Sequence, residues 1–310
     1  MSIGEIDISW DSLRRIVQDW AGTSAELAEF EPLVGGCINT TLLLKLKDGA
    51  KAVLKLNPYR VDISYQREAT QLALLKSLSI PVPEVYKWKI GTLDDPISYL
   101  LIEFMEGVDF AHAKTCCNAD EFDHLQRHLA EIILAMHEQT NSQYMRIMEG
   151  GQGFDNWCGF YRHVYDPILN EVEKHPLLPK GCRKTLHKIH EKFDRLIAHG
   201  DKPRLVHWDI WATNLLARQD ASGKWRLSAL LDPNCKYAHA EAEIAYMQLF
   251  NTVTPAFMQA YQQVHKLTSD YHNYRKPIYQ LYPLLNHLRL FGHEYVKPVA
   301  AAVERCAALV

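Results

Sequence analysis

The sequence predicts an α+β fold in which a small β-rich N-terminal lobe, residues 1–107, precedes a larger and mainly helical C-terminal lobe, residues 108–310. Two short segments rich in Leu, Val and Lys, 41–47 and 51–57, flank the turn-forming pair Asp48-Gly49, which favours a β-hairpin. Apolar residues return at helical spacing once in the N-terminal lobe and repeatedly in the C-terminal lobe. The strands are therefore expected early in the chain and the helices late.

The remaining N-terminal elements follow from breaks in these patterns. From Ser64 onward, one helical face is expected to carry Ala69, Leu72, Leu75 and Leu78. The run Ile80-Pro81-Val82-Pro83 removes backbone donors and ends that helix. Segments 84–88 and 99–105 are predicted strands, joined by a turn-rich linker, and the lobe is predicted to end near Gly107.

Helical periodicity dominates the C-terminal lobe. It is clearest in 122–136 and returns in 254–266 and 277–291. The exception is 205–232, where two short predicted strands, 204–206 and 225–231, surround an irregular loop.

Composition limits the class of partner. The chain is 47% hydrophobic and 23% charged with a formal net charge of −3, so no general attraction to nucleic acid or anionic lipid is expected. The 7 cysteines include no CxxC pair, and this odd count is typical of a reducing compartment. No export or membrane segment is evident, and we expect a cytoplasmic monomer or homodimer.

The irregular loop of the C-terminal lobe carries three polar residues suited to phosphoryl transfer. Asp209 and Asn214 lie five positions apart on the loop, and Asp232 ends the strand that follows. Phosphoryl transfer needs a carboxylate that accepts the proton of the attacking hydroxyl, together with oxygen ligands for Mg²⁺. The order predicts Asp209 as the catalytic base and Asn214 and Asp232 as metal ligands. His207 is expected to brace the loop.

The N-terminal lobe supplies the complementary half of an ATP site. Lys55 lies on the second hairpin strand, where it can reach the nucleotide phosphates while it pairs with Glu68 of the following helix. Gly35 and Gly36, in the run that ends at Asn39, allow backbone N–H groups to approach phosphate. Both halves occur in the chain order that a kinase requires.

Two further features belong to this predicted site. The segment 101–107 joins the lobes, so the Glu103 carbonyl and the Met105 amide are candidates for pairing with adenine. Cys37 directly follows the glycine pair, where backbone N–H groups and Lys55 favour a thiolate. Reversible oxidation of Cys37 is expected to block ATP entry.

These motifs resemble the fructosamine kinase (ketosamine kinase) family, within the aminoglycoside phosphotransferase-like and protein-kinase-like superfamily. The resemblance covers nearly the whole chain and includes a C-terminal segment that is similar to fructosamine kinases in particular. It rests on the runs Gly35–Asn39, Val53–Lys55, Arg67–Ala69, His207–Asn214, Leu231–Pro233, Ala240–Ala245, Tyr279–Leu288 and Leu290–Gly292. It implies a two-lobed protein-kinase-like fold, use of ATP and Mg²⁺, and phosphorylation of sugar-derived ketoamines of the fructosamine or ribulosamine type.

The chain also departs from the family at positions that bear on the acceptor. Trp208 stands where the family usually has Gly, and with Trp211 it is expected to line the acceptor cleft. The segment after Asn156 is shortened, and Ala238 and Glu243 replace the usual Gly and Asp. Two alternatives therefore stay open: a kinase of another small acceptor, such as an aminoglycoside, amino alcohol or sugar, and a non-catalytic nucleotide-binding module.

Overall fold

The computed structural model describes residues 8–33, 40–59 and 64–310, which form two compact units. The N-terminal unit comprises the chain up to Cys116 together with Thr213–Pro233, and the C-terminal unit comprises Cys117–Ala212 and Asn234–Val310. This grouping differs from a single boundary after Gly107, because the hairpin of 215–230 pairs with Val108–Asp109. The division of the chain into an N-terminal nucleotide-binding lobe, 1–107, and a C-terminal catalytic lobe, 108–310, stays a prediction.

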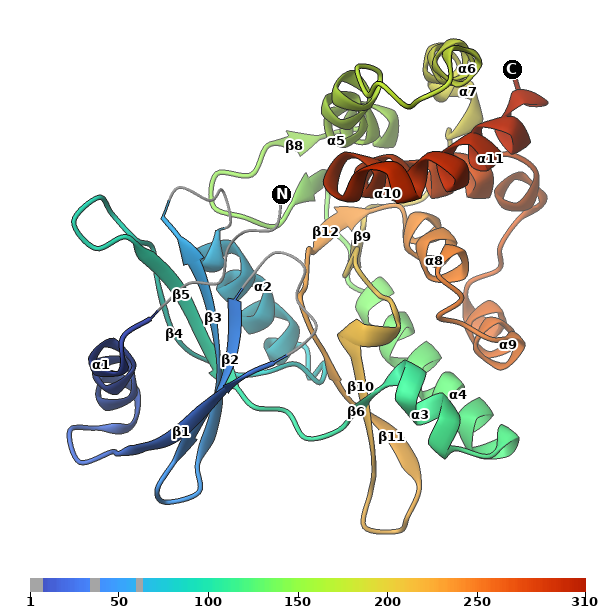
Figure 1. Cartoon of the computed structure of the whole chain (residues 1–310). Helices are drawn as coiled ribbons and strands as arrows, with labels where there is room; N and C mark the ends of the chain where they lie inside the picture. The colour runs from blue at the N-terminus through green and yellow to red at the C-terminus, as the bar shows by residue number, and fades with distance from the viewer. Residues whose placement is uncertain (1–7, 34–39, 60–63) are drawn as a thin grey trace. The chain divides into compact units, whose positions relative to one another are not determined.

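A five-stranded antiparallel sheet forms the centre of the N-terminal unit (Figure 1). Its strand order is β1-β2-β3-β5-β4. The predicted hairpin is confirmed, since β2 pairs with β3 and the Asp48 carboxylate accepts the Ala50 N–H at 2.9 Å in the turn between them. The strands are β1 (Leu27–Pro32), β2 (Thr40–Leu46), β3 (Lys51–Pro58), β4 (Val85–Lys89) and β5 (Ile97–Glu103).

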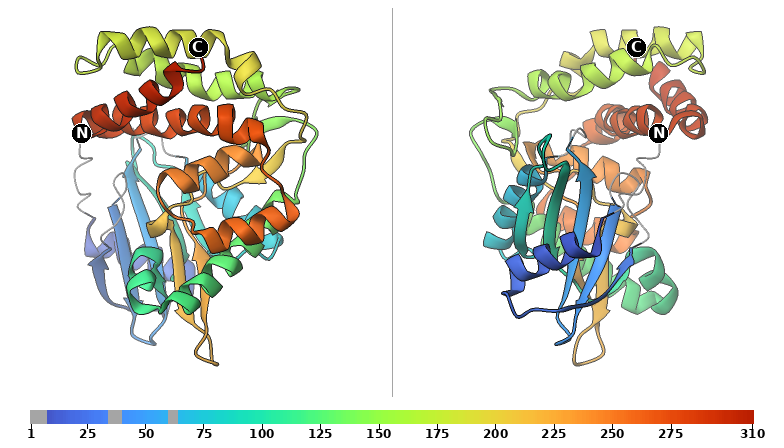
Figure 2. Two further views of the ribbon diagram at one scale, coloured as in Figure 1. Left: turned by 90° about the vertical axis from the view of Figure 1, so that its right-hand side faces the viewer. Right: turned by 60° about the vertical axis from the view of Figure 1, so that its left-hand side comes forward.

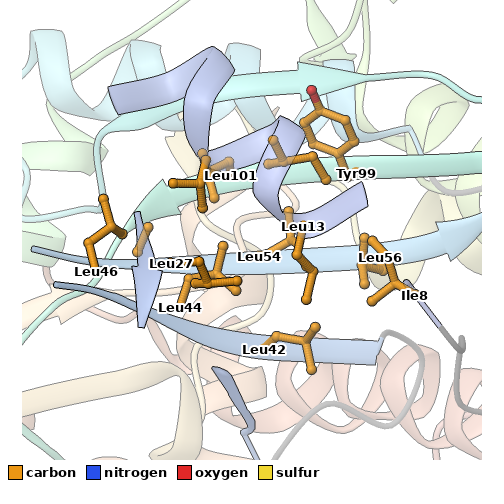
Figure 3. Packing of buried hydrophobic residues seen from close by; sticks show 13 residues of the cluster. Ile8, Leu13, Leu27, Leu42, Leu44, Leu46, Leu54, Leu56, Tyr99 and Leu101 are labelled. Carbon is orange, nitrogen blue, oxygen red and sulfur yellow. The ribbon is translucent and has the colours of Figure 1, made fainter. Parts of the chain in front are cut away.

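The two faces of this sheet have different partners. One face packs its leucines against α1 (Trp10–Ala21), as Figure 3 shows for Leu13 of the helix over Leu54 and Leu56 of β3. Side chains alternate along a strand, so Lys55, between those two leucines, points to the opposite face. There α2 (Tyr65–Ser77) lies against β4 and β5.

The helix α1 was missed by the sequence-based prediction. Ser9 caps it by accepting the Ser12 N–H at 3.2 Å, and the buried Leu13, Ile16 and Val17 share one face. This cap and spacing were visible in the sequence. The helix covers the leucine-rich face of the sheet and so leaves the lysine-bearing face to α2.

A second, three-stranded sheet completes the N-terminal unit, with the order β11-β10-β6. The predicted strand at 225–231 is confirmed as β11, whereas β10 was not predicted. Gly107 precedes β6 with φ +149, and a Cβ there would lie 2.7 Å from Ser228 Oγ, so glycine is required at this close approach. The elements are β6 (Val108–Asp109), α3 (Phe110–Cys116), β10 (Leu215–Gln219) and β11 (Trp225–Leu230).

The C-terminal unit is mainly helical, as predicted. The three periodic segments form α4 (Ala119–His137), α9 (Pro255–Val264) and α10 (Lys276–Phe291). In both views of Figure 2, the red helices α10 and α11 lie beside the yellow-green α5 and α6, which agrees with the packing of α10 on α5 and of α11 on α6. The other helices are α5 (Trp157–Val172), α6 (Lys180–Glu191), α7 (Phe193–Leu196), α8 (Ala240–Leu249), η2 (Tyr271–Arg275), η3 (Gly292–Tyr295) and α11 (Val296–Ala307).

A small four-stranded sheet crosses this helical unit, with the order β8-β7-β12-β9. Its strands are β7 (Tyr144–Arg146), β8 (Gly153–Phe154), β9 (Arg204–Val206) and β12 (Lys236–Ala238). A short 3₁₀ turn, η1 (Ala212–Asn214), ends the loop that follows β9. In the described part of the chain, each helix is too short or too polar to span a membrane.

Candidate active site

A buried ion cluster in the N-terminal unit joins three of the predicted site residues. Ser64 caps α2 by accepting the Arg67 N–H at 3.1 Å, which places Glu68 in the first turn, facing β3. The Lys55 ammonium lies 2.5 Å from Glu68 Oε1 and also donates to Asp232 Oδ1. The predicted pair of Lys55 and Glu68 is thus formed, and Asp232 joins it.

Burial and charge act in opposite directions on Lys55. The side chain is 7% exposed, and this burial disfavours the ammonium. The carboxylates of Asp232 and Glu68 outweigh burial and raise the pKa of Lys55, so the lysine remains a cation. Asp232 is 45% exposed, so this end of the cluster faces solvent while the lysine and the glutamate are held inside.

Asn214 and Asp232 are neighbours because of the β10–β11 hairpin. Leu215 pairs with Leu230, and the Leu231 N–H donates to the Asn214 carbonyl at 2.8 Å, so the residues that flank the hairpin meet at its end. Asp232 has φ +56, a left-handed conformation that Asp tolerates better than most residues. An amide and a carboxylate at one hairpin end are oxygen donors of the kind that Mg²⁺ accepts.

Asp209 lies in the C-terminal unit, on the loop after β9. Its carboxylate Oδ1 accepts the Tyr246 O–H at 2.5 Å, and the preceding Trp208 N–H donates to Glu243 Oε1 at 2.7 Å. The fully buried His207 presents its carbonyl to the Asn234 N–H at 3.0 Å. Three consecutive residues of the predicted catalytic loop are therefore held by hydrogen bonds within one unit.

The buried carboxylate of Glu243 connects the loop to α4. Glu243 Oε2 lies 2.9 Å from His137 Nε2, and His137 Nδ1 lies 2.9 Å from the Tyr261 hydroxyl. Both members of the Glu243–His137 pair are fully buried. Buried polar atoms are normally hydrogen-bonded, and here one oxygen of Glu243 holds the loop while the other holds α4.

The ring of Trp208 is packed inside the C-terminal unit. Only 8% of the residue is exposed, its ring contacts Trp157 and Tyr282 edge-on, and Lys236 Nζ lies 4.7 Å from its centroid. Its φ is +69, which is uncommon for a bulky residue. Trp211 is half-buried. Contact of either ring with an acceptor remains a prediction.

The remaining predicted site residues divide into two groups. Glu103 closes β5, where its Oε2 accepts the Glu84 N–H at 3.0 Å, and Met105 follows the strand in a half-buried segment; their adenine contacts stay predictions. The phosphate-loop prediction falls outside the described residues, and so does the redox prediction for the neighbouring cysteine. These residues are Gly35, Gly36, Cys37 and Asn39.

A second polar cluster, which the sequence did not suggest, lies in the C-terminal unit. His199, Asp201 and His239 place one donor atom each within 4.8 Å of one another. His239 Nε2 lies 3.0 Å from Asp201 Oδ2, and the two imidazole rings stack with centroids 3.5 Å apart. Imidazole lone pairs lie in the ring plane, so two stacked parallel rings do not direct them at one ion. This arrangement fits packing better than metal ligation.

The same cluster predicts a loss of stability in mild acid. Burial, with a smaller contribution from His239, lowers the pKa of His199 from 6.5 to about 3, so the unfolded chain binds the proton first as the pH falls. The contribution of His199 is complete above about pH 6.5, and about 2 kcal/mol is lost by about pH 5. Thermal unfolding between pH 7 and pH 5 measures it.

His199→Asn, whose side-chain oxygen can still accept the Asp201 N–H, is expected to reduce this dependence on pH. The matched control is His187→Asn, because His187 is 59% exposed and pairs with Glu173 at the surface. The control is expected to keep the wild-type slope of unfolding free energy against pH. Equal slopes in wild type and His199→Asn would contradict the assignment.

The amino-acid sequence is similar to those of known proteins of one family. The sequence profile of the fructosamine kinases matches residues 9–308. A probable ketoamine kinase of Enterococcus faecium is 28% identical over 283 residues, covering 88% of this chain and 93% of the relative. The chloroplastic protein-ribulosamine 3-kinase of Oryza sativa is 28% identical over 296 residues, covering 88% of this chain and 77% of the relative.

Solved structures confirm the predicted fold class. A Haemophilus somnus protein provisionally named fructosamine-3-kinase superposes with a TM-score of 0.75 at 23% identity, covering 96% of this chain and 97% of that chain. An aminoglycoside phosphotransferase in a ternary complex with AMP-PNP and hygromycin B has a TM-score of 0.66 at 16% identity, covering 96% and 97% of the two chains. The chain therefore has the α+β, protein-kinase-like fold, belongs to the fructosamine kinase family, and is a phosphotransferase of that family.

Proposed function

We propose that this chain transfers the γ-phosphoryl group of ATP, with Mg²⁺, to a hydroxyl of a ketoamine of the fructosamine or ribulosamine type. The observation that carries the proposal is the cluster of Lys55, Glu68 and Asp232. A lysine that two carboxylates keep charged in a largely buried position is typical of a nucleotide site. Ion pairs that lie only at the protein surface do not require such burial.

The donor set supports a metal ion beside this lysine. Asp232 offers a carboxylate and Asn214 an amide at the same hairpin end, and Asp232 is partly exposed. Mg²⁺ is commonly held by one or two such side chains together with phosphate oxygens and water. When bound, the ion neutralises charge on the phosphates. Lys55 would hold the α- and β-phosphates, with Glu68 fixing its direction.

Asp209 is the proposed catalytic base. Its carboxylate orients the acceptor hydroxyl and accepts its proton as the bond to phosphorus forms. The same carboxylate accepts the Tyr246 O–H at 2.5 Å. Around ATP, we assign adenine contacts to Glu103 and Met105, and phosphate contacts to Gly35, Gly36 and Asn39.

The choice of a ketoamine acceptor rests on the family and on the names of its relatives, which include a ribulosamine kinase and several probable ketoamine kinases. Trp208 and Trp211 are the proposed acceptor-side aromatics. Fold alone does not select the acceptor, since an aminoglycoside phosphotransferase of similar fold was solved in a complex with hygromycin B.

A substrate comparison tests the proposal. Purified protein with ATP and Mg²⁺ is given fructosyl-lysine, ribulosyl-lysine, lysine, glucose, choline or kanamycin, and ADP release is measured. We expect the two ketoamines to raise turnover above all the others, with unmodified lysine as the matched control for the amine. Preference for glucose, choline or kanamycin would reassign the acceptor, and ADP release that no acceptor stimulates would favour a non-catalytic module.

A further inference from the structure

One face of α8 holds two consecutive residues of the loop that carries the proposed base. Glu243 accepts the Trp208 N–H at 2.7 Å, and Tyr246 donates its O–H to Asp209 Oδ1 at 2.5 Å. The two α8 residues are three positions apart, so they lie on the same side of the helix. One contact acts on the backbone of the loop and the other acts directly on the carboxylate.

The helix that presents these groups is itself fixed by long-range contacts. Glu241 at its start forms a paired interaction with Arg275, with Oε1 2.9 Å from Nη2. Near its middle, the Ala245 carbonyl accepts the Gln280 amide at 3.1 Å. Both partners come from the segment 275–280, so this segment holds α8 at its start and near its middle. A hydroxyl on such a helix has a defined position relative to the loop.

Tyr246 can act only as the donor in its bond to Asp209. Burial raises the pKa of its phenol, and the neighbouring Asp209 carboxylate raises it further, so the proton stays on the tyrosine oxygen. The phenol is uncharged and the carboxylate is the acceptor, which makes this a charge-assisted hydrogen bond. Such a bond stabilises the ionised carboxylate and holds it in one rotamer.

We propose that Tyr246 is a positioning residue for phosphoryl transfer, whose O–H donates to the Asp209 carboxylate and holds it in one orientation. The inference rests on the proposed function, because it assigns Tyr246 a role through the proposed base. It gives a role to a tyrosine that none of the kinase-like motifs in the sequence indicated. Tyr246 does not touch the reacting atoms and acts through Asp209.

The test compares Tyr246→Phe with wild type in the full chain, using ATP, Mg²⁺ and the acceptor that gives the highest turnover. Losing one charge-assisted hydrogen bond is expected to lower kcat about tenfold. It is also expected to move the acidic limb of the kcat/KM profile about one unit to higher pH. The KM for ATP is expected to stay within about twofold of wild type, since Tyr246 is not among the proposed nucleotide contacts.

Tyr271→Phe is the matched control. Tyr271 is also buried, and its hydroxyl donates to Gln248 Oε1 on the same helix at 2.8 Å, away from the loop. The Tyr271→Phe substitution also removes a phenolic oxygen that bonds to α8. Because this bond lies away from the loop, kcat and the pH profile are expected to stay as in wild type. Thermal unfolding of both variants is measured, and assays are run where each is fully folded.

The other titratable groups around Asp209 are the same in wild type, Tyr246→Phe and Tyr271→Phe. Tyr282 of α10 and Tyr295 of η3 contribute phenols near Tyr246, and Glu243 contributes the second carboxylate on α8. The cations acting on Tyr282 are Arg146 of β7 and Arg289 of α10. A shift of the acidic limb in Tyr246→Phe alone is therefore attributable to the lost hydroxyl.

The outcomes separate this inference from the proposed function. If Asp209→Asn abolishes turnover but Tyr246→Phe retains wild-type kcat and an unshifted acidic limb, the inference is overturned and the function stands. A fall in kcat without any shift of the limb would make the role of Tyr246 merely structural and also overturns it. Wild-type turnover in Asp209→Asn would remove the proposed base, and the inference with it.

Discussion

Replacement of Asp209 by Asn is expected to lower kcat by about two to four orders of magnitude, because the amide cannot accept the proton of the acceptor hydroxyl. The substitution preserves shape, and the Asn oxygen can still accept the Tyr246 O–H that now meets Asp209 Oδ1. Folding and ATP affinity are therefore expected to stay close to wild type. Single-turnover kinetics with saturating ATP would measure the loss.

Asp155→Asn is the control for this substitution. Asp155 is an exposed carboxylate in the same unit whose Oδ1 accepts the Gln143 amide at 2.8 Å, and its change is expected to leave kcat unaltered. The catalytic assignment of Asp209 fails if Asp209→Asn turns over as fast as the Asp155→Asn protein. Thermal unfolding of both variants excludes a loss of folded protein as the cause.

The second large effect is expected for Asp232→Ala. Without this carboxylate the proposed metal site loses its charged ligand, and the phosphates lose the cation that bridges them to the protein. Affinity for ATP in the presence of Mg²⁺ is expected to fall about 100-fold, or about 2.8 kcal/mol. Folding is expected to persist, because Lys55 retains its ion pair with Glu68. Calorimetric titration of ATP at several Mg²⁺ concentrations measures the change.

The β10–β11 turn offers a matched control for this substitution. Asp220 lies in the same unit and accepts from Ser222 and Arg226, so Asp220→Ala removes one carboxylate from the same hairpin at its other end. ATP titrations of Asp220→Ala are expected to match wild type at every Mg²⁺ concentration. If Asp232→Ala gives the same Mg²⁺ dependence as this control, the metal ligands lie elsewhere.

Local patterns in the sequence were sufficient for the elements that carry half of the proposed site. The Asp48-Gly49 turn between alternating strands determined the hairpin, and the position of Lys55 within it determined which sheet face the lysine occupies. Glu68 follows from its place one turn into a capped helix. These predictions succeeded because strand alternation and helix capping depend on neighbours in the sequence.

Some elements were missed, and for one of them, α1, a local signal existed. The Ser9 cap marks the start of α1, and Leu13, Ile16 and Val17 follow at helical spacing. The strand β10 directly follows η1 and becomes a strand through pairing with β6 and β11. Its register depends on residues far away, so no local pattern identifies it.

The sequence alone therefore indicated the family and the fold class, and it supplied the chemical types at the proposed site. Only the tertiary structure decided which groups meet: Lys55 with Asp232 across 177 residues, His137 with Glu243 across 106, and Tyr246 with Asp209 across 37. Each pairing sets the charge or orientation of a buried group. Such contacts form only when packing brings distant elements together, and sequence spacing carries no information about that distance.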